Sequence, residues 1–344
     1  MSRNEVRMLP PLDLPLDQRP IANNPAPPPH KPTAAVPSSL LRAFRPELAG
    51  TVRQKTEATL AQLEAKLGAP YFSTDGFILF NCDSLSALKA LEDCQLKFDL
   101  TITSPPYNIG KAYESVVAVD EYVRWCTSWM SAVHKVTASN GAFWLNLGYL
   151  SVPLKGRAVP IPYLLWDKTP FFLIQELVWN YGAGVTAKHS FAPRNEKWLF
   201  FVKDEGTYTF NLDDVRDPNV KYPNQKKNGK FRCNPLGKNP SDVWQFPKVT
   251  TGKDRSSKER TSHPAQFPLG VVERIVRASS NEGGLVLDPF SGSASTGLAA
   301  AGTGRIYVGF EMRKDYCQES VERLRRFQKA RKDAGSQLSL SSIG

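Results

Sequence analysis

The chain has 344 residues, with 44 lysines and arginines against 33 acidic residues and a formal net charge of +11. This excess of positive charge suggests an anionic partner, although it carries no information about the fold. The sequence has no run of about 18 apolar residues and no basic start followed by an apolar core, so we expect neither a membrane span nor a secretory signal.

Five scattered cysteines, odd in number and without Cys-x-x-Cys spacing, argue against a disulfide framework and against a zinc cluster. We therefore expect no metal, and a reducing cytoplasmic environment.

The first 50 residues hold 11 of the 27 prolines. Such a segment cannot form a packed core, so we expect a disordered tail over 1–50. An amphipathic helix is predicted over 51–67, where Leu60, Leu63 and Leu67 recur at helical spacing among charges.

Alternating strands and helices are predicted next. An apolar strand from Phe77 ends in Asp83, and Ser84 fits the N-cap of the following helix. Further strands are predicted over 98–102, 142–147, 171–181 and 198–203, and helices over 120–137 and 162–169. In these helices we expect Tyr122, Trp125, Trp129 and Val133 to form core rather than a base-stacking platform, and Leu164, Leu165 and Trp166 to point inward.

Two successive prolines end the strand over 98–102, because proline fixes φ and lacks an N–H donor. The loop beyond it carries the Ser104 hydroxyl and the Tyr107 ring on either side of Pro105 and Pro106. Carbonyl groups held by proline rings suit a site that grips an amino group. Pro-Pro taken alone is more typical of a simple turn.

The stretch 204–262 breaks the alternation. Between 221 and 260 it carries eleven lysines and arginines against three acidic residues, with four aromatic residues interleaved, Tyr222, Phe231, Trp244 and Phe246. A solvated charged face is one interpretation, but this composition favours nucleic-acid contact. The candidate phosphate contacts are Lys221, Lys226, Lys227, Lys230, Arg232 and Lys238.

Regular alternation returns over 263–330. A loop of small residues follows a strand at Asp288, where backbone N–H groups at a helix start can approach a ligand closely. Glu311 ends the next strand, in the position of a carboxylate that accepts two ribose hydroxyls. The loop lacks the glycine pattern of NAD sites and the lysine of P-loops, which argues against both NAD and ATP.

The string Ser104-Pro105-Pro106-Tyr107 resembles the catalytic motif of DNA amino-methyltransferases, in which Asp, Asn or Ser precedes Pro-Pro and an aromatic residue. The loop after Asp288 resembles their S-adenosylmethionine motif, Asp-Pro-Phe-x-Gly-Ser-Gly-Thr. The resemblance implies S-adenosyl-L-methionine as cofactor, held by Asp83, Asp288, Pro289, Phe290, Ser291, Gly292, Ser293 and Glu311. Asp83 would hold the adenine amino group, Glu311 the ribose, and the segment from His263 to Pro268 would help to close on the methionine end.

The catalytic motif precedes the cofactor motif, which is the circularly permuted order of the family's β group. This order implies a Rossmann-like α/β fold with a seven-stranded, mostly parallel sheet, one strand antiparallel and helices on both faces. It divides the chain into a catalytic half (51–203), a target-recognition insert (204–262), a cofactor-binding half (263–330) and a flexible tail (331–344). Ala294 and Ser295 replace the usual Gly and Thr, and we expect the Ala294 methyl to crowd the cofactor.

By this resemblance, Ser104 and the Pro105 carbonyl accept the two hydrogens of an exocyclic amine while Tyr107 stacks on a base flipped out of duplex DNA. Serine before Pro-Pro favours cytosine N4, and adenine N6 stays open as the alternative. A non-catalytic DNA-binding protein on the same fold is a further alternative, for which Ala294 is the hint. The implied partners are double-stranded DNA and a cognate restriction endonuclease. The implied location is the cytoplasm, in association with the nucleoid.

Overall fold

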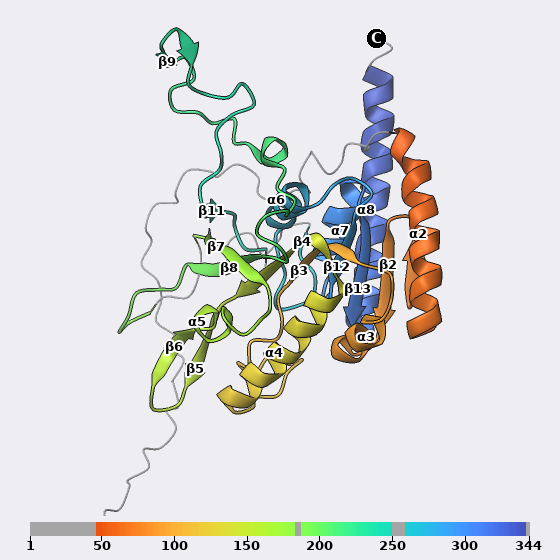
Figure 1. The fold of residues 1–344 in the computed structure, drawn as a ribbon, viewed down its shortest axis with the longest axis vertical. Helices are drawn as coiled ribbons and strands as arrows, with labels where there is room; N and C mark the ends of the chain where they lie inside the picture. The colour runs from red at the N-terminus through yellow and green to blue at the C-terminus, as the bar shows by residue number, and fades with distance from the viewer. Residues whose placement is uncertain (1–45, 183–186, 250–258, 342–344) are drawn as a thin grey trace, which may run out of the picture. The chain divides into compact units, whose positions relative to one another are not determined.

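A computed structural model describes residues 46–182, 187–249 and 259–341, and its centre is a nine-stranded sheet (Figure 1). The strands of this sheet are β1 (Phe72–Thr74), β2 (Phe77–Asn81), β3 (Phe98–Thr103), β4 (Thr137–Leu147), β7 (Phe172–Asn180), β8 (Asn195–Val202), β11 (Val243–Gln245), β12 (Leu285–Asp288) and β13 (Ile306–Glu311). Their order across the sheet is β1-β2-β13-β12-β3-β4-β8-β7-β11. Two separate hairpins pair β5 (Tyr149–Val152) with β6 (Gly156–Pro160), and β9 (Lys226–Lys227) with β10 (Lys230–Phe231).

The mostly parallel sheet confirms the predicted fold class, but the predicted number of seven strands is wrong. Seven central strands do run from β2 to β7, and within them only β8 is antiparallel to its neighbours. The two additional strands, β1 and β11, have three residues each and pair at the two edges of the sheet. Strands this short leave almost no periodic signal in a sequence.

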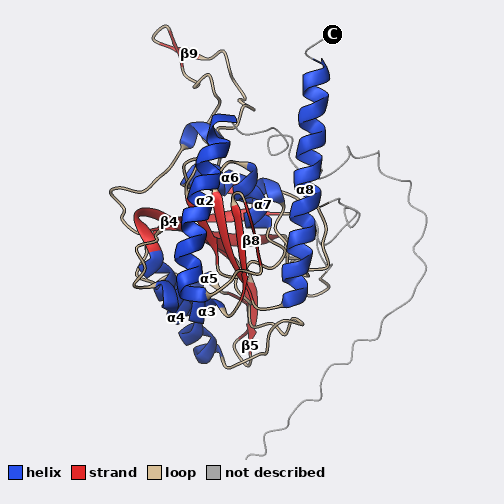
Figure 2. Ribbon diagram, turned by 90° about the vertical axis from the view of Figure 1, so that its right-hand side faces the viewer, coloured by secondary structure: helices blue, strands red, loops and turns tan. Residues whose placement is uncertain are grey.

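Helices cover both faces of the sheet (Figure 2). They are α2 (Pro46–Leu67), α3 (Ser84–Leu91), α4 (Val119–Val136), α5 (Pro162–Leu165), the 3₁₀ helix η1 (Leu212–Val215), α6 (Leu269–Ser279), α7 (Ser295–Gly302) and α8 (Lys314–Ser341). Buried side chains of α2 to α5 share one core cluster, and those of α6 to α8 share the other. Strand alternation explains this division, since Ala142 and Trp144 of β4 enter the second cluster while Phe143 and Leu145 enter the first.

Several predicted boundaries shift in the structure. Asp83, not Ser84, caps α3, because its Oδ1 accepts a hydrogen bond from the Ser86 backbone N–H at 2.8 Å. Helix α5 ends at Leu165, and the Trp166 side chain is exposed rather than inward. Helix α8 continues to Ser341, although a flexible tail was expected from 331.

The predicted N-terminal tail lies outside the described residues up to position 45, and α2 begins at Pro46. Within the described ranges, none of the helices combines the length and the apolar character needed to cross a bilayer.

Candidate active site

The carboxyl ends of neighbouring parallel strands bring the two motifs together. Strands β2, β13, β12 and β3 are adjacent and parallel, so the residues that follow them meet at one edge of the sheet. Asp83, Ser104, Asp288 and Glu311 all line a single cavity of about 480 Å³ there. The other proposed catalytic and cofactor residues, Pro105, Pro106, Tyr107, Pro289, Phe290, Ser291, Gly292 and Ser293, line the same cavity.

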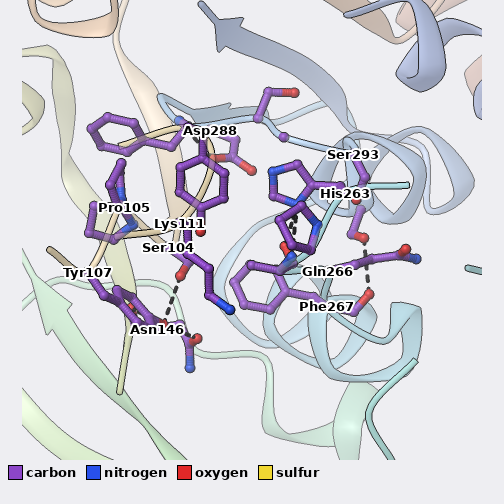
Figure 3. A pocket seen from close by; sticks show the side chains of 18 of the residues that line it. Ser104, Pro105, Tyr107, Lys111, Asn146, His263, Gln266, Phe267, Asp288 and Ser293 are labelled. Atoms are coloured by element: carbon purple, nitrogen blue, oxygen red, sulfur yellow. Dashed lines mark hydrogen bonds between the residues drawn. The ribbon is translucent and has the colours of Figure 1, made fainter. Parts of the chain in front are cut away.

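Hydrogen bonds fix the Pro-Pro loop within this cavity (Figure 3). The Ser104 hydroxyl donates to the Tyr107 hydroxyl at 2.9 Å, and the Tyr107 hydroxyl donates to Asn146 Oδ1 at 2.7 Å. The Tyr122 hydroxyl donates to the Pro106 carbonyl at 3.0 Å. Burial raises the pKa of Tyr107 well above its usual value, so its hydroxyl keeps its proton throughout the physiological range.

The segment after the loop folds back and closes it. Asn108 has φ of 61°, a left-handed conformation that asparagine tolerates better than most residues. Its side chain binds Val117 in both directions, donating to the carbonyl at 2.9 Å and accepting from the N–H at 2.8 Å. The Glu114 carboxylate accepts from the backbone N–H groups of Asn108, Ile109 and Lys111. The rigid part of the loop therefore extends beyond the two prolines.

Asp288 connects β3 to the loop that follows β12. Its Oδ1 accepts from the Thr103 hydroxyl at 2.7 Å and from the Phe290 backbone N–H at 3.2 Å. Burial is the main cause that raises the pKa of this carboxyl to about 6, while the hydrogen bonds oppose the shift. The two motif loops are thus joined through one buried side chain.

The Glu311 carboxylate is hydrogen-bonded to the loop that contains Gly292. The Glu311 carboxylate accepts from the backbone N–H groups of Gly292 and Arg313, each at 2.8 Å. A carboxylate offers about four lone-pair directions, so two remain for the hydroxyls of a ribose. Gly292 has φ of 51°, and a Cβ there would lie 3.0 Å from His263 Nε2. Only glycine fits this close approach without displacing the imidazole.

The segment around His263 covers the cofactor loop. The His263 ring stacks on Tyr113, with centroids 5.6 Å apart and planes 10° apart, and packs edge-on against Tyr316. Gln266 accepts from the Thr261 N–H at 3.0 Å and donates to the Glu259 carbonyl at 2.6 Å. Burial lowers the pKa of His263, which favours the neutral imidazole.

The expectation that the Ala294 methyl crowds the cofactor is wrong. Ala294 is fully buried in the core cluster of α6 to α8, whereas its neighbours Ser293 and Ser295 line the cavity. Its unusual feature is a backbone φ of 54° at the N-cap of α7. An alanine in this left-handed conformation costs about 1–2 kcal/mol, so the departure from glycine affects the backbone rather than the pocket.

The structure adds cavity residues that the sequence analysis missed. Trp125, predicted to be core, lines the cavity and packs against Phe290 with centroids 5.6 Å apart, whereas Trp129 is buried as predicted. Further lining residues from outside the two motifs are Lys111, Tyr113, Asn146, Tyr149, Trp179, Tyr181, Glu196 and Lys248. Of these, Asn146 offered a signal, because it is the one polar residue in the otherwise apolar run 142–147.

The six candidate phosphate contacts lie on exposed positions away from the cavity lining: Lys221, Lys226, Lys227, Lys230, Arg232 and Lys238. Lys226, Lys227 and Lys230 belong to the β9–β10 hairpin, and Arg232 follows it. The hairpin turns through Asn228 and Gly229 at positive φ and extends away from the sheet (Figure 1). Trp244, counted among the interleaved aromatic residues, is buried and stacks on Trp144 at 5.8 Å. Residues 250–258 of the predicted insert lie outside the described part of the chain.

Comparisons with known proteins agree with this geometry. A family model described as DNA methylase, covering N6 and N4 enzymes, matches residues 98–322. The Type II methyltransferase M.ScaI of Streptomyces caespitosus is 60% identical over 268 residues, which span 78% of this chain and 88% of that protein. The DNA adenine methyltransferase YhdJ of Escherichia coli K12 is 31% identical over 74% of this chain and 84% of that protein.

A solved structure shares the fold. The PvuII DNA methyltransferase, which is described as cytosine-N4-specific, superposes with a TM-score of 0.55 at 21% identity, covering 76% of this chain and 94% of that one. The family match covers both motif loops and the strands that carry them, and the chain therefore belongs to the S-adenosylmethionine-dependent DNA amino-methyltransferases.

Proposed function

We propose that this DNA methyltransferase acts on the exocyclic N4 of cytosine in duplex DNA. The observation that carries the choice of base is Ser104 in front of Pro105, at the edge where the two motif loops share one cavity. In the resemblance stated above, serine at this position goes more often with cytosine. S-adenosylmethionine supplies the methyl group in this family.

The residues of the cavity then divide into two groups. Ser104 Oγ and the Pro105 carbonyl each accept a hydrogen bond from one N–H group of the target amine, and Tyr107 stacks on the flipped base. Held in this way, the amine nitrogen becomes pyramidal and its lone pair points toward the methyl group. Such positioning can contribute roughly 7–11 kcal/mol to catalysis.

On the other side of the cavity, Glu311 is assigned to the ribose and Asp83 to the adenine amino group. The cap of α3 uses Asp83 Oδ1, which fixes the carboxylate at the rim of the cavity. Asp288 and the backbone from Pro289 to Ser293 shape the cradle between them. The six exposed basic residues defined above would hold DNA phosphates, which positions the duplex without reading its sequence.

Adenine N6 is the second candidate target. It is supported by the similarity to the E. coli relative, whose name specifies adenine. The chemistry is the same for either base, since both amines are conjugated with their ring. A cognate restriction endonuclease is also proposed, because the most similar relative described above is named a Type II methyltransferase.

Expression in a host that lacks DNA methylation tests this proposal. Sequencing of its DNA by a method that distinguishes modified bases should show N4-methylcytosine at one recurrent sequence. N6-methyladenine would instead establish the alternative target, and unmodified DNA from cells that contain folded protein would refute the proposed activity.

A further inference from the structure

A chain of hydrogen bonds leads from the proposed amine acceptor into the sheet. The Ser104 hydroxyl donates to the Tyr107 hydroxyl at 2.9 Å, which donates to Asn146 Oδ1 at 2.7 Å. The Asn146 Nδ2 group in turn donates to the Lys197 backbone carbonyl at 3.0 Å. Asn146 is fully buried at the end of β4, next to β8, so its amide has little freedom to rotate.

The direction of each bond in this chain is fixed by its last member. A backbone carbonyl only accepts, so the Asn146 NH₂ must face Lys197 and its Oδ1 must face Tyr107. The Tyr107 hydroxyl therefore donates its one hydrogen to Asn146, whose backbone carbonyl also accepts at 3.2 Å. The Tyr107 oxygen is left as an acceptor, and Ser104 must supply the hydrogen of the next bond.

We propose that Asn146 and the Tyr107 hydroxyl are positioning groups that hold the Ser104 hydroxyl hydrogen away from the target amine. This inference rests on the proposed function. It adds one requirement that Ser104 cannot meet alone, namely that its hydroxyl hydrogen points away from the target amine. A serine hydroxyl both donates and accepts, and with its hydrogen turned toward the amine it would oppose an N–H group. With its one hydrogen donated to Tyr107, Ser104 Oγ can act toward the amine only as an acceptor.

The methyl transfer itself keeps the Ser104 proton in place. As the bond from sulfur to the methyl carbon breaks, its electron pair returns to sulfur, and the amine lone pair forms the new N–C bond. The methylated nitrogen then loses one of its own protons to water. The Asn146 side chain is an amide that does not ionise at physiological pH. The series of hydrogen bonds from Ser104 to Asn146 therefore orients the Ser104 hydroxyl hydrogen and does not conduct protons. The high pKa of Tyr107 keeps its hydroxyl a donor throughout this step.

A carboxylate at position 104 removes the need for this orientation, because it has no hydrogen to misdirect. The family pattern accepts Asp before Pro-Pro, so Ser104→Asp is a conservative change for this site. This contrast allows a test by double-mutant cycle, in which the cost of Tyr107→Phe is measured in the parent and in the Ser104→Asp background. Phenylalanine keeps the ring that stacks on the base and removes only the hydroxyl.

The quantity to measure is the single-turnover rate of tritium transfer from labelled S-adenosylmethionine to unmethylated DNA, with the full chain at saturating concentration. In the parent, Tyr107→Phe should lower this rate on the order of 10- to 100-fold, as expected for a lost interaction with the reacting group. The dissociation constant of the cofactor should stay within about twofold. In the Ser104→Asp background, the same substitution should change the rate by less than about threefold.

Tyr122→Phe is the matched control. It removes another buried tyrosine hydroxyl, contributed by α4, which binds the Pro106 carbonyl of the loop and not Ser104. Its cost should be equal in the two backgrounds, because it supports the backbone of the loop. If Tyr107→Phe also costs the same in both, its hydroxyl is a structural support and the inference is wrong.

A second cycle keeps the inference testable if Ser104→Asp is inactive. Asn146→Leu should lower the rate less than Tyr107→Phe, because the Asn146 backbone carbonyl still accepts from Tyr107. Added to Tyr107→Phe, it should lower the rate no further, since the chain is already interrupted. Independent, multiplying effects of the two substitutions would overturn the inference. An inactive parent would contradict the proposed function itself, which separates the two failures.

Discussion

Asp288 illustrates how one residue can serve structure and site at an energetic cost. Its carboxyl is buried between β3 and β12, and burial raises its pKa from 3.8 in an exposed chain to about 6. Because the folded state favours the protonated form, this group contributes stability that is fully present below about pH 3.8 and is lost as the pH rises through about 6.

Asp288→Asn should remove this pH dependence. A shift of about 2 pKa units corresponds to about 3 kcal/mol, so the unfolding free energy of the parent relative to the variant should fall by up to that amount between pH 4 and 6.5. Urea titrations of both proteins across this range measure the difference. A difference that stays constant with pH would show that Asp288 is not protonated preferentially in the folded state.

Glu311→Ala should weaken cofactor binding through two routes. It removes the proposed acceptor of the ribose hydroxyls and also the carboxylate that holds the Gly292 N–H at 2.8 Å. Loss of two charge-assisted hydrogen bonds predicts a dissociation constant raised on the order of 100-fold in equilibrium dialysis. Asp315→Ala, an exposed acid nearby, is the control and should bind within about twofold of the parent. Normal binding by Glu311→Ala would exclude its assignment to the ribose.

Ala294→Gly should change little. Glycine relieves the strain of φ at 54°, but it removes a buried methyl and adds freedom to the unfolded chain, so these effects nearly cancel within about 1 kcal/mol. Cofactor affinity should at least equal that of the parent and stay within about twofold of it. Ala299→Gly in α7, at an ordinary helical position, should instead lower the free energy of unfolding by about 1–2 kcal/mol. Thermal unfolding of both variants measures this difference. Markedly tighter cofactor binding by Ala294→Gly would mean that the methyl reaches the cofactor after all.

The β9–β10 hairpin carries three of the proposed phosphate contacts, so its part in DNA binding can be tested directly. Replacing Lys226, Lys227 and Lys230 by Ala should flatten the log–log dependence of DNA affinity on salt by up to about three units, since each phosphate contact releases counterion. Specific and random DNA should be affected alike, and cofactor binding should not change.

A control variant of equal charge carries Ala at Arg325, Arg326 and Lys329, which are exposed on α8. Its salt dependence should match the parent. An unchanged slope in the hairpin variant would mean that its charge is a solvated surface and that DNA contacts other basic residues.

Elements with strong periodicity were predictable, and those without it were not. The strands that carry the motifs, β3, β12 and β13, are apolar runs that end in polar loops, and all three were found. The edge strands β1 and β11 were missed because three residues carry no period. The capping of α3 by Asp83 rather than Ser84 depended on which oxygen meets the Ser86 N–H, a detail that only the folded backbone decides.

The order of the two motifs in the sequence predicted how the folded chain brings the residues of the cavity together. The catalytic loop comes first in the sequence, yet parallel pairing of β3 with β12 brings it beside the cofactor loop. Trp125 was not recognised as a cavity residue, because a core tryptophan and a cavity tryptophan have the same helical spacing. Such assignments require knowing which face of each element meets the cavity.

Methyl transfer by the purified protein shows directly whether this cavity modifies cytosine N4. Labelled S-adenosylmethionine and unmethylated duplex DNA are incubated with the parent or with Ser104→Ala, and the DNA is digested to nucleosides. We expect tritium in N4-methylcytosine for the parent, with a much lower rate for Ser104→Ala at nearly unchanged cofactor affinity. Label in N6-methyladenine would overturn the choice of base, and an undiminished rate for Ser104→Ala would exclude its role in holding the amine. No transfer by folded parent protein would refute the proposed activity.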